Sequence, residues 1–173
     1  MLPYLKTSRE VVIIAAVAEN GVIGNQGRIP WWDDVELRRE DMRHFRKLTL
    51  GKSVIMGYST FQSLGKLLPD RLNIILSRKE GLYIPGASVC SDLDSALFVG
   101  HTFHPEVCVI GGGELYREAL SHATRLEITE IQGRYQGDVF FPSYKNTGEW
   151  GEVVRQPQEG FAFVTYMPRN PNV

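Results

Sequence analysis

The segment spanning residues 11–17, VVIIAAV, is apolar at every position and rich in β-branched side chains. A strand of this composition is covered by apolar layers on both faces, because alternate side chains point to opposite sides of a sheet. Such strands occupy the interior of sheets that are flanked by helices. The segment therefore predicts an α/β fold in which it forms a strand buried on both faces.

Shorter apolar runs follow along the chain and alternate with helical patterns. The runs predict strands over residues 53–56, 72–76 and 107–110. The segments between them predict helices over residues 38–50, 60–64, 92–99 and 114–120. Residues 125–131 and 161–167 alternate as antiparallel strands do, and the polar residues 144–160 indicate a surface excursion. We expect a mixed sheet, mostly parallel with an antiparallel C-terminal strand, flanked by helices.

Composition narrows the class of partner. The chain of 173 residues has the length of one domain, and its 19 basic and 20 acidic residues give a net charge of −1. This balance argues against a dedicated nucleic-acid or anionic-membrane binder, and the longest apolar run is far shorter than a membrane span of ~20 residues. Cys90 and Cys108 lack the spacing of a zinc site or a disulfide framework. We expect free thiols in the cytoplasm, no metal, and a small-molecule partner.

One acidic residue of the predicted helix 38–50 faces inward. The positions one or two turns from Asp41 are apolar, namely Leu37, Phe45 and Leu48. The corresponding positions around Glu40 are polar, namely Glu36, His44 and Lys47. An ionised carboxylate in an apolar setting costs several kcal/mol unless it is paired, so Asp41 is a candidate for ligand binding or acid–base chemistry. The alternative is a capping or surface aspartate.

Three junctions between predicted strands and the segments that follow carry glycines or hydroxyls. Gly111, Gly112 and Gly113 let the backbone approach a ligand closely and aim N–H groups at a phosphate, although neither the G-x-G-x-x-G nor the Walker pattern is present. The second junction contains Gly57, Ser59 and Thr60, and the third contains Ser77 and Arg78. Structural turns and helix caps are the alternative. Together the junctions favour an extended, phosphate-rich ligand such as a dinucleotide.

These blocks, in this order, resemble the dihydrofolate reductase family. The matching segments are residues 14–16, 20–24, 29–31, Asp41 with Phe45, 51–57 with 60–61, 69–74, 109–113 with Tyr116, and 137–142. They extend over nearly the whole chain, from residue 11 to about residue 167. The resemblance implies a dihydrofolate reductase-like sheet in one domain over residues 1–173, with residues 1–10 as an N-terminal extension.

The resemblance also implies an activity, the reduction of 7,8-dihydrofolate to tetrahydrofolate for one-carbon metabolism. A hydride would pass from NADPH to C6 of the pterin, and N5 would gain a proton. Asp41 matches the acid that binds the pterin and Thr129 the threonine that contacts it, while Arg71 would bind the glutamate carboxylate, with Arg46 and Lys66 assisting. The implied substrate-binding set is Ile14, Ala16, Ile29, Phe45, Arg46, Leu64, Leu68, Arg71, Ile110 and Tyr116.

For the cofactor NADPH, the resemblance implies a cis peptide between Gly111 and Gly112 and a mobile loop over residues 18–31 that closes on the nicotinamide. Ser77 and Arg78 would meet the adenosine 2′-phosphate. The implied cofactor-binding set is Ala16, Ile23, Gly24, Gly57, Tyr58, Ser59, Thr60, Ser77, Arg78, Ile110, Gly111, Gly112, Gly113, Glu114, Leu115 and Tyr116.

Two positions depart from the family pattern. Tyr58 stands where many relatives carry a basic residue for the 2′-phosphate, so the preference for NADPH over NADH rests on Arg78. Nine residues, 32–40, separate Trp31 from Asp41, more than in typical bacterial relatives. We expect a cytoplasmic monomer that binds dihydrofolate and antifolate inhibitors, without nucleic-acid or membrane partners. A pyrimidine reductase of riboflavin biosynthesis and a non-catalytic nucleotide-binding protein are the alternatives. The Pro30–Trp31 block, Asp41 with Phe45, and Arg71 argue against the first, and the intact Asp41 and glycines 111–112 argue against the second.

Overall fold

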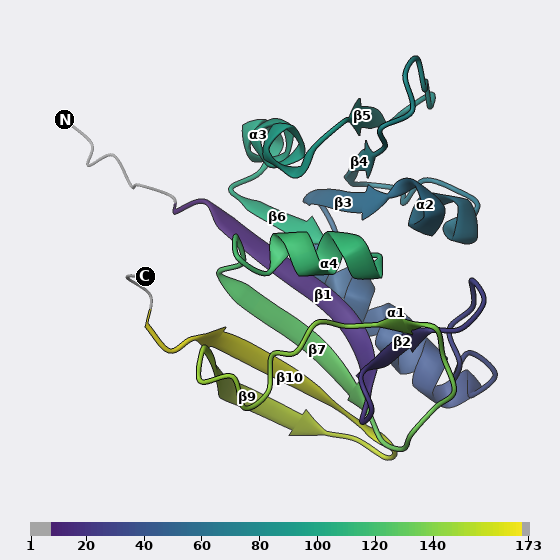
Figure 1. The fold of residues 1–173 in the computed structure, drawn as a ribbon, viewed down its shortest axis with the longest axis vertical. Helices are drawn as coiled ribbons and strands as arrows, with labels where there is room; N and C mark the ends of the chain where they lie inside the picture. The colour runs from purple at the N-terminus through teal and green to yellow at the C-terminus, as the bar shows by residue number, and fades with distance from the viewer. Residues whose placement is uncertain (1–7, 171–173) are drawn as a thin grey trace.

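The computed structural model describes residues 8–170 of the chain (Figure 1). The helices are α1 (Val35–Thr49), α2 (Tyr58–Leu64), α3 (Leu93–Phe103) and α4 (Gly113–Ala119). The strands are β1 (Glu10–Ala18), β2 (Val22–Gly24), β3 (Ser53–Gly57), β4 (Leu72–Leu76), β5 (Ser88–Cys90), β6 (Glu106–Val109), β7 (Arg125–Ile131), β8 (Val139–Phe140), β9 (Trp150–Pro157) and β10 (Phe161–Pro168). One sheet has the order β5-β4-β3-β6-β1-β7-β10-β9, and β2 and β8 pair separately.

Strand β1 lies inside the sheet, in parallel between β6 and β7. Its alternate side chains enter different apolar clusters. Ile13 packs with residues of α3 and α4, whereas Ile14 packs with Phe45 of α1 and Phe61 of α2. Figure 1 shows α3 and α4 on the near face of the sheet and α1 on the far face. The predicted α/β fold with helices on both faces is therefore confirmed.

The sheet changes character at β7. The ladders from β5 to β7 are all parallel, whereas β10 pairs antiparallel with both β7 and β9. The prediction of a mixed, mostly parallel sheet is confirmed, and its antiparallel part contains two C-terminal strands. Residues 125–131 are antiparallel only toward β10, because their other edge pairs in parallel with β1.

The prediction of a surface excursion over residues 144–160 is wrong for its middle part. Residues 150–157 form β9, which pairs with β10 at the edge of the sheet, and Tyr144 and Trp150 are buried. Most β9 side chains are exposed, so the strand carries polar residues without a clear alternation. Strands β2, β5 and β8 also escaped prediction, because two or three residues are too few to show a period.

Helix α1 begins at Val35, three residues before the predicted start. The Asp34 side chain caps it by accepting a hydrogen bond from the Leu37 amide at 3.0 Å. Most of the long segment between Trp31 and Asp41 is thus an extension of the helix. Residues 1–7 of the predicted N-terminal extension lie outside the described residues, and β1 begins at Glu10.

The described residues also include two cysteines, no helix that could span a membrane and no cluster of metal ligands. Cys90 and Cys108 are free thiols, and burial raises the pKa of the Cys108 thiol to about 12. Between residues 8 and 170, no helix is both long enough and apolar enough to cross a membrane. The same part of the chain holds no group of three acidic, histidine or cysteine side chains placed to bind a metal ion.

Candidate active site

Asp41 projects from α1 toward the sheet and meets Thr129 of β7. The Thr129 hydroxyl donates a hydrogen bond to Asp41 Oδ1, with an O···O distance of 2.6 Å. Thr129 is only 4% exposed and lies opposite Ala16 in the β1–β7 ladder. The structure therefore brings the two predicted catalytic residues into direct contact at the sheet surface.

The surroundings of this pair set the protonation of the carboxyl group. Burial raises the pKa of Asp41 above its ordinary value, and the hydrogen bond from Thr129 partly offsets the rise. Tyr116 is buried nearby, where desolvation and the charge of Asp41 raise the pKa of its phenol. Its hydroxyl donates to the Ile14 carbonyl at 2.7 Å. The site thus holds a carboxyl suited to acid–base work and a phenol that keeps its proton.

Apolar side chains predicted to contact the substrate surround this polar pair. The partly buried residues that pack on the same cluster as Ile14 are Phe45, Leu68 and Ile110. Ala16 belongs to a neighbouring cluster with Trp31 and Leu37. Ile29 and Leu64 are exposed, at 37% and 43% of their surface. Phe45, Leu68 and Ile110 thus pack on one cluster with Ile14, whereas Ile29 and Leu64 leave large apolar surfaces open to solvent.

Arg71 is held in place by two hydrogen bonds. Its Nε donates to Thr49 Oγ1 at 2.8 Å, and its Nη1 donates to the Pro69 carbonyl at 2.7 Å. Burial lowers the pKa of Arg71, and the nearby charge of Arg46 adds to the effect. Two of the five guanidinium N–H groups are thus used for positioning, and the others remain for a ligand. Arg46 and Lys66 are exposed.

Sequence reasoning missed Thr49 as the group that orients Arg71. Thr49 is fully buried at the end of α1, where its hydroxyl donates to the Phe45 carbonyl at 2.9 Å and accepts from Arg71. Thr49 lies one turn after Phe45, and this spacing was the available signal. The contact with Arg71 depends on the fold and has no local signature.

A cleft of about 630 Å³ opens where the three glycine- or hydroxyl-bearing junctions meet. Its lining residues are Gly57, Tyr58, Ser59, Thr60, Leu76, Ser77, Arg78, Ser91, Asp92, Gly112, Gly113, Glu114, Leu115 and Glu118. The three junctions lie together because β3 is hydrogen-bonded between β4 and β6 in parallel. Ten of the predicted cofactor residues therefore line a single cleft.

The glycine turn is packed tightly enough to require glycine. The peptide between Gly111 and Gly112 is cis, as the resemblance implies. The Gly57 amide donates to the Gly111 carbonyl at 2.8 Å, and Gly111 has a φ of +129°, which disfavours other residues. A Cβ at Gly113 would lie 2.9 Å from Val139 Cγ1. The absence of side chains lets the backbone itself form the wall of the cleft.

Six of the cofactor candidates do not line this cleft. They are Ala16, Ile23, Gly24, Ile110, Gly111 and Tyr116. Tyr116 lies under the turn, since a Cβ at Gly111 would come within 3.3 Å of its hydroxyl. The same hydroxyl bonds to Ile14. Tyr116 therefore connects the glycine turn with the Asp41 side of the site.

Four lining residues were not predicted as cofactor contacts. They are Leu76, Ser91, Asp92 and Glu118. Asp92 caps α3 by accepting from the Ser95 amide at 2.8 Å, and a capping role was what its sequence context indicated. Its place beside the end of β4 follows from the pairing of β4 with β5, and β5 was too short to predict.

The loop over residues 18–31 is fastened to the segment 138–141. The Gln26 amide donates to both carboxylate oxygens of Asp138, at 3.1 and 3.2 Å. The Asp138 amide donates to the Gly24 carbonyl at 3.1 Å, and the Phe141 amide donates to the Gly21 carbonyl at 2.9 Å. This set of hydrogen bonds, which we call the loop latch, holds β2 against β8 beside the glycine turn.

The residues of the cleft fit a dinucleotide. Hydroxyls at Ser59 and Thr60, glycines at 57, 112 and 113 and the guanidinium of Arg78 supply donors and close backbone approach along one continuous wall. A Cβ at Gly112 would lie 3.3 Å from Thr60 Oγ1, so a side chain there would press on that hydroxyl.

Comparison with known proteins agrees with this arrangement. The family model described as dihydrofolate reductase matches residues 10–166. Dihydrofolate reductase type 3 of Salmonella typhimurium is 43% identical over 145 residues, covering 84% of this chain and 85% of that protein. Dihydrofolate reductase of Mycobacterium tuberculosis strain H37Rv is 41% identical over 150 residues, covering 82% and 87%.

A solved structure extends the comparison to three dimensions. Dihydrofolate reductase from Enterococcus faecalis, complexed with NADP(H) and RAB-propyl, superposes with a TM-score of 0.82 at 26% identity. The match covers 94% of this chain and 98% of that chain. Because the family model spans residues 10–166 and the Salmonella typhimurium and Mycobacterium tuberculosis relatives are each more than 40% identical over more than four fifths of the chain, the chain belongs to the dihydrofolate reductase family.

Proposed function

We propose that this chain reduces 7,8-dihydrofolate to tetrahydrofolate with NADPH, as its family does. The observation that carries the proposal is the position of Tyr116 between the buried Asp41–Thr129 pair and the glycine-lined cleft. A site for an acid–base step and a site for a dinucleotide are thereby joined through one buried side chain. Hydride transfer between two bound molecules needs this kind of adjacency.

In the proposed mechanism, Asp41 orients the pterin and supports protonation at N5. Its carboxylate accepts hydrogen bonds from the 2-amino group and a ring nitrogen, which fixes the ring against Phe45 and Ile14. Because burial raises the pKa of Asp41, the carboxyl group favours a proton on the pterin, delivered to N5 through water. Thr129 positions the carboxyl, and Arg71 offers its free N–H groups to the glutamate tail.

On the cofactor side, NADPH when bound supplies the hydride that reaches C6. The chain contributes the binding surface: Ser59 and Thr60 donate to the pyrophosphate, and Ser77 and Arg78 bind the 2′-phosphate. Tyr58 carries no charge there, so discrimination against NADH rests on Arg78. The loop latch holds residues 18–31 beside the glycine turn, where the loop would exclude water from the reacting atoms.

Further properties follow from the same proposal. Antifolate inhibitors would occupy the Asp41 side of the site, with their cationic or donor groups on the carboxylate. We infer that the chain acts as a monomer in the cytoplasm, where two free thiols persist in reduced form. Residues 1–173 would act as one domain, with the N-terminal extension ending where β1 begins at Glu10.

The direct test follows the absorbance of NADPH with dihydrofolate as substrate, and then repeats the assay with NADH. We expect consumption of NADPH that depends on dihydrofolate, and slower consumption of NADH. Asp41→Asn, measured in parallel, should lose most of the rate while retaining the NADPH affinity. If the wild-type chain consumes neither cofactor, the proposed function is wrong.

A further inference from the structure

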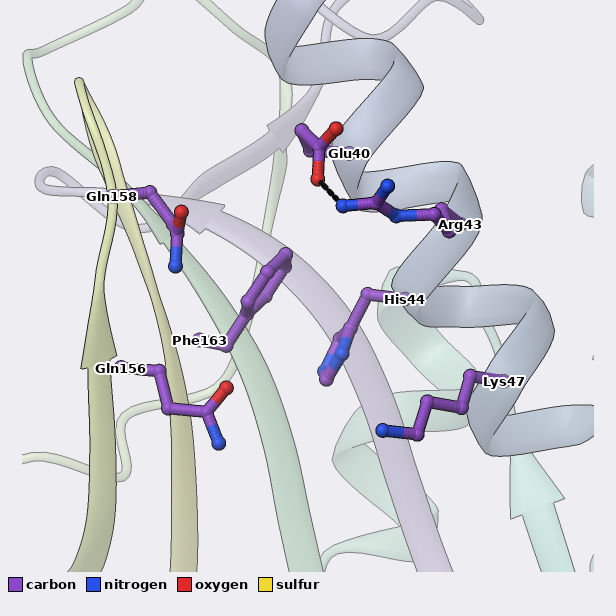
Figure 2. A pocket seen from close by; sticks show the side chains of 7 residues that line it. All are labelled: Glu40, Arg43, His44, Lys47, Gln156, Gln158 and Phe163. Carbon is purple, nitrogen blue, oxygen red and sulfur yellow. Dashed lines mark hydrogen bonds and ion pairs between the residues drawn. The ribbon is translucent and has the colours of Figure 1, made fainter.

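Helix α1 has a second flank that the proposed reaction does not use. The polar stripe identified around Glu40 lies against the β9–β10 hairpin, on the side of the helix away from Phe45 (Figure 2). A pocket of about 300 Å³ lies between them, lined by Glu40, Arg43, His44, Lys47, Gln156, Gln158 and Phe163. None of these residues belongs to the predicted folate or cofactor sets. We call this space the hairpin pocket.

Two stacked rings form an apolar surface in the hairpin pocket. The His44 and Phe163 ring centroids are 3.9 Å apart with an interplanar angle of 21°, and Figure 2 shows the two rings facing each other between helix and hairpin. Phe163 is held in register opposite Thr129 and packs edge-on against Phe161. The surface is therefore fixed by the sheet and is present before any ligand arrives.

The surroundings of His44 favour its neutral form. Burial lowers the pKa of His44 below its ordinary value of about 6.5, the charge of Lys47 lowers it further, and Glu127 opposes both effects. A neutral imidazole stacked on a phenyl ring adds area and polarisability without adding charge. The stack therefore suits a flat, uncharged ring.

The polar groups around the stack are unequally engaged. Arg43 and Glu40 form an ion pair, so their charges cancel locally. Lys47 forms no ion pair with any residue between 8 and 170, and in Figure 2 its ammonium group points toward the hairpin. The side-chain amides of Gln156 and Gln158 have no hydrogen-bond partner within the described part of the chain. One positive charge and two amides are thus free around the stacked rings.

We propose that the hairpin pocket is a second ligand site, for a small monoanion that carries a flat ring, namely an aromatic carboxylate. The carboxylate would pair with Lys47 and accept a hydrogen bond from Gln156, and the ring would pack against the outer side of the His44–Phe163 stack. A volume of about 300 Å³ holds one or two fused rings and excludes a dinucleotide. The proposal does not depend on the reductase activity, because no residue of the reaction takes part.

The experiment titrates the full-length protein with 2-naphthoate by isothermal titration calorimetry. Two probes serve as controls: 2-naphthamide keeps the ring but lacks the charge, and acetate keeps the charge but lacks the ring. We expect 2-naphthoate to bind with a dissociation constant below about 1 mM, and each control to bind at least about tenfold more weakly. If 2-naphthoate does not bind at about 1 mM, or if it binds no better than the two controls, the proposal is wrong.

Variants distinguish binding in the hairpin pocket from binding in the proposed dihydrofolate site, where Arg71 could also pair with an aromatic carboxylate. Lys47→Gln should weaken binding at least about tenfold, while the exposed Lys79→Gln and the folate-side Arg71→Gln should leave it intact. Gln156→Glu, on an exposed strand residue, should repel the carboxylate without disturbing the core. Loss of binding in Arg71→Gln, with retention in Lys47→Gln and Gln156→Glu, would assign the probe to the folate side and overturn the proposal.

Discussion

The two halves of the proposed active site differ in whether side chains or backbone form them. On the substrate side, the chemistry resides in side chains, with Asp41 and Thr129 in contact at 2.6 Å and Arg71 fixed on Thr49. On the cofactor side, the wall consists largely of backbone, and Gly113 leaves no room for a Cβ beside Val139. The function of the substrate half therefore depends on the chemical groups of its side chains. The function of the cofactor half depends on the absence of side chains from its wall.

This contrast predicts opposite sensitivities to substitution. An isosteric change that removes a charge or a hydrogen-bonding atom should damage the substrate half and spare the fold. In the cofactor half, the addition of a single methyl group should do more harm than the removal of a whole exposed side chain. The following changes test the contrast, from the largest expected effect to the smallest.

Asp41→Asn keeps the shape of the side chain and removes its acid–base function. We expect kcat for dihydrofolate reduction at neutral pH to fall by at least ~10², the scale of a lost general acid or base. Steady-state kinetics with NADPH in excess measure the loss. A rate close to that of the wild type would remove Asp41 from the mechanism.

The same variant has a stability control. The folded pKa of Asp41 is raised, so the ionised carboxylate destabilises the fold, and stability is lost as pH rises through that pKa. Asp41→Asn should therefore unfold at a higher temperature than the wild type at pH 7, and the gap should close as pH falls toward the ordinary value of about 3.9. Inactivity together with lower stability would instead indicate a damaged fold.

Arg71→Lys keeps the positive charge and removes the planar guanidinium group with its paired N–H donors. The lost charged hydrogen bonds should raise KM for dihydrofolate by the equivalent of about 1.5–3 kcal/mol, with kcat little changed. The measurement is the KM for dihydrofolate at saturating NADPH, with the KM for NADPH as internal control. An unchanged KM for dihydrofolate would contradict the proposed tail contact.

Gly113→Ala tests the cofactor half. The new Cβ would lie 2.9 Å from Val139 Cγ1 and 3.4 Å from the Phe140 carbonyl, so β8 or the glycine turn must shift, at a cost of about 1–3 kcal/mol. We expect a higher KM for NADPH. Glu114→Ala, which removes an exposed carboxylate from the same cleft, should have the smaller effect. The reverse order would refute the contrast between the two halves.

Thr129→Val should have the smallest effect on the rate and a clear effect on its pH dependence. The Thr129 hydroxyl lowers the pKa of Asp41, so its removal leaves burial unopposed and raises that pKa further. The limb of the kcat profile that reports Asp41 should therefore move to higher pH. A limb that moves to lower pH, or does not move, would show that Thr129 does not control the protonation of Asp41.

The order of the central elements could be predicted because each has a strong local signal. The doubly apolar strand at residues 11–17, the helix closed by Gly51 and the glycine turn at 111–113 depend on composition and period alone. Strand β9 could not be predicted, since an exposed edge strand has no buried face to impose a pattern. The helical period likewise identified the buried flank of α1 at Asp41.

Contacts between distant segments account for the parts of the site that were missed. Asp92 enters the cleft only because β5 pairs with β4, and Thr49 meets Arg71 across 22 positions of the sequence. The surroundings of the polar flank of α1 could not be predicted either. Its period separated His44 and Lys47 from the apolar flank, yet nothing in the local sequence placed the β9–β10 hairpin beside them.

The loop latch also has a kinetic consequence. Three backbone amides, of Gln26, Asp138 and Phe141, fasten the loop, so its release requires several hydrogen bonds to break together. Such an opening is a single event with its own rate. The rate of ligand release from the closed pocket cannot exceed this opening rate. At a pH high enough that every opening leads to exchange, the exchange of the Gln26 amide hydrogen with deuterium measures this opening rate without any substrate.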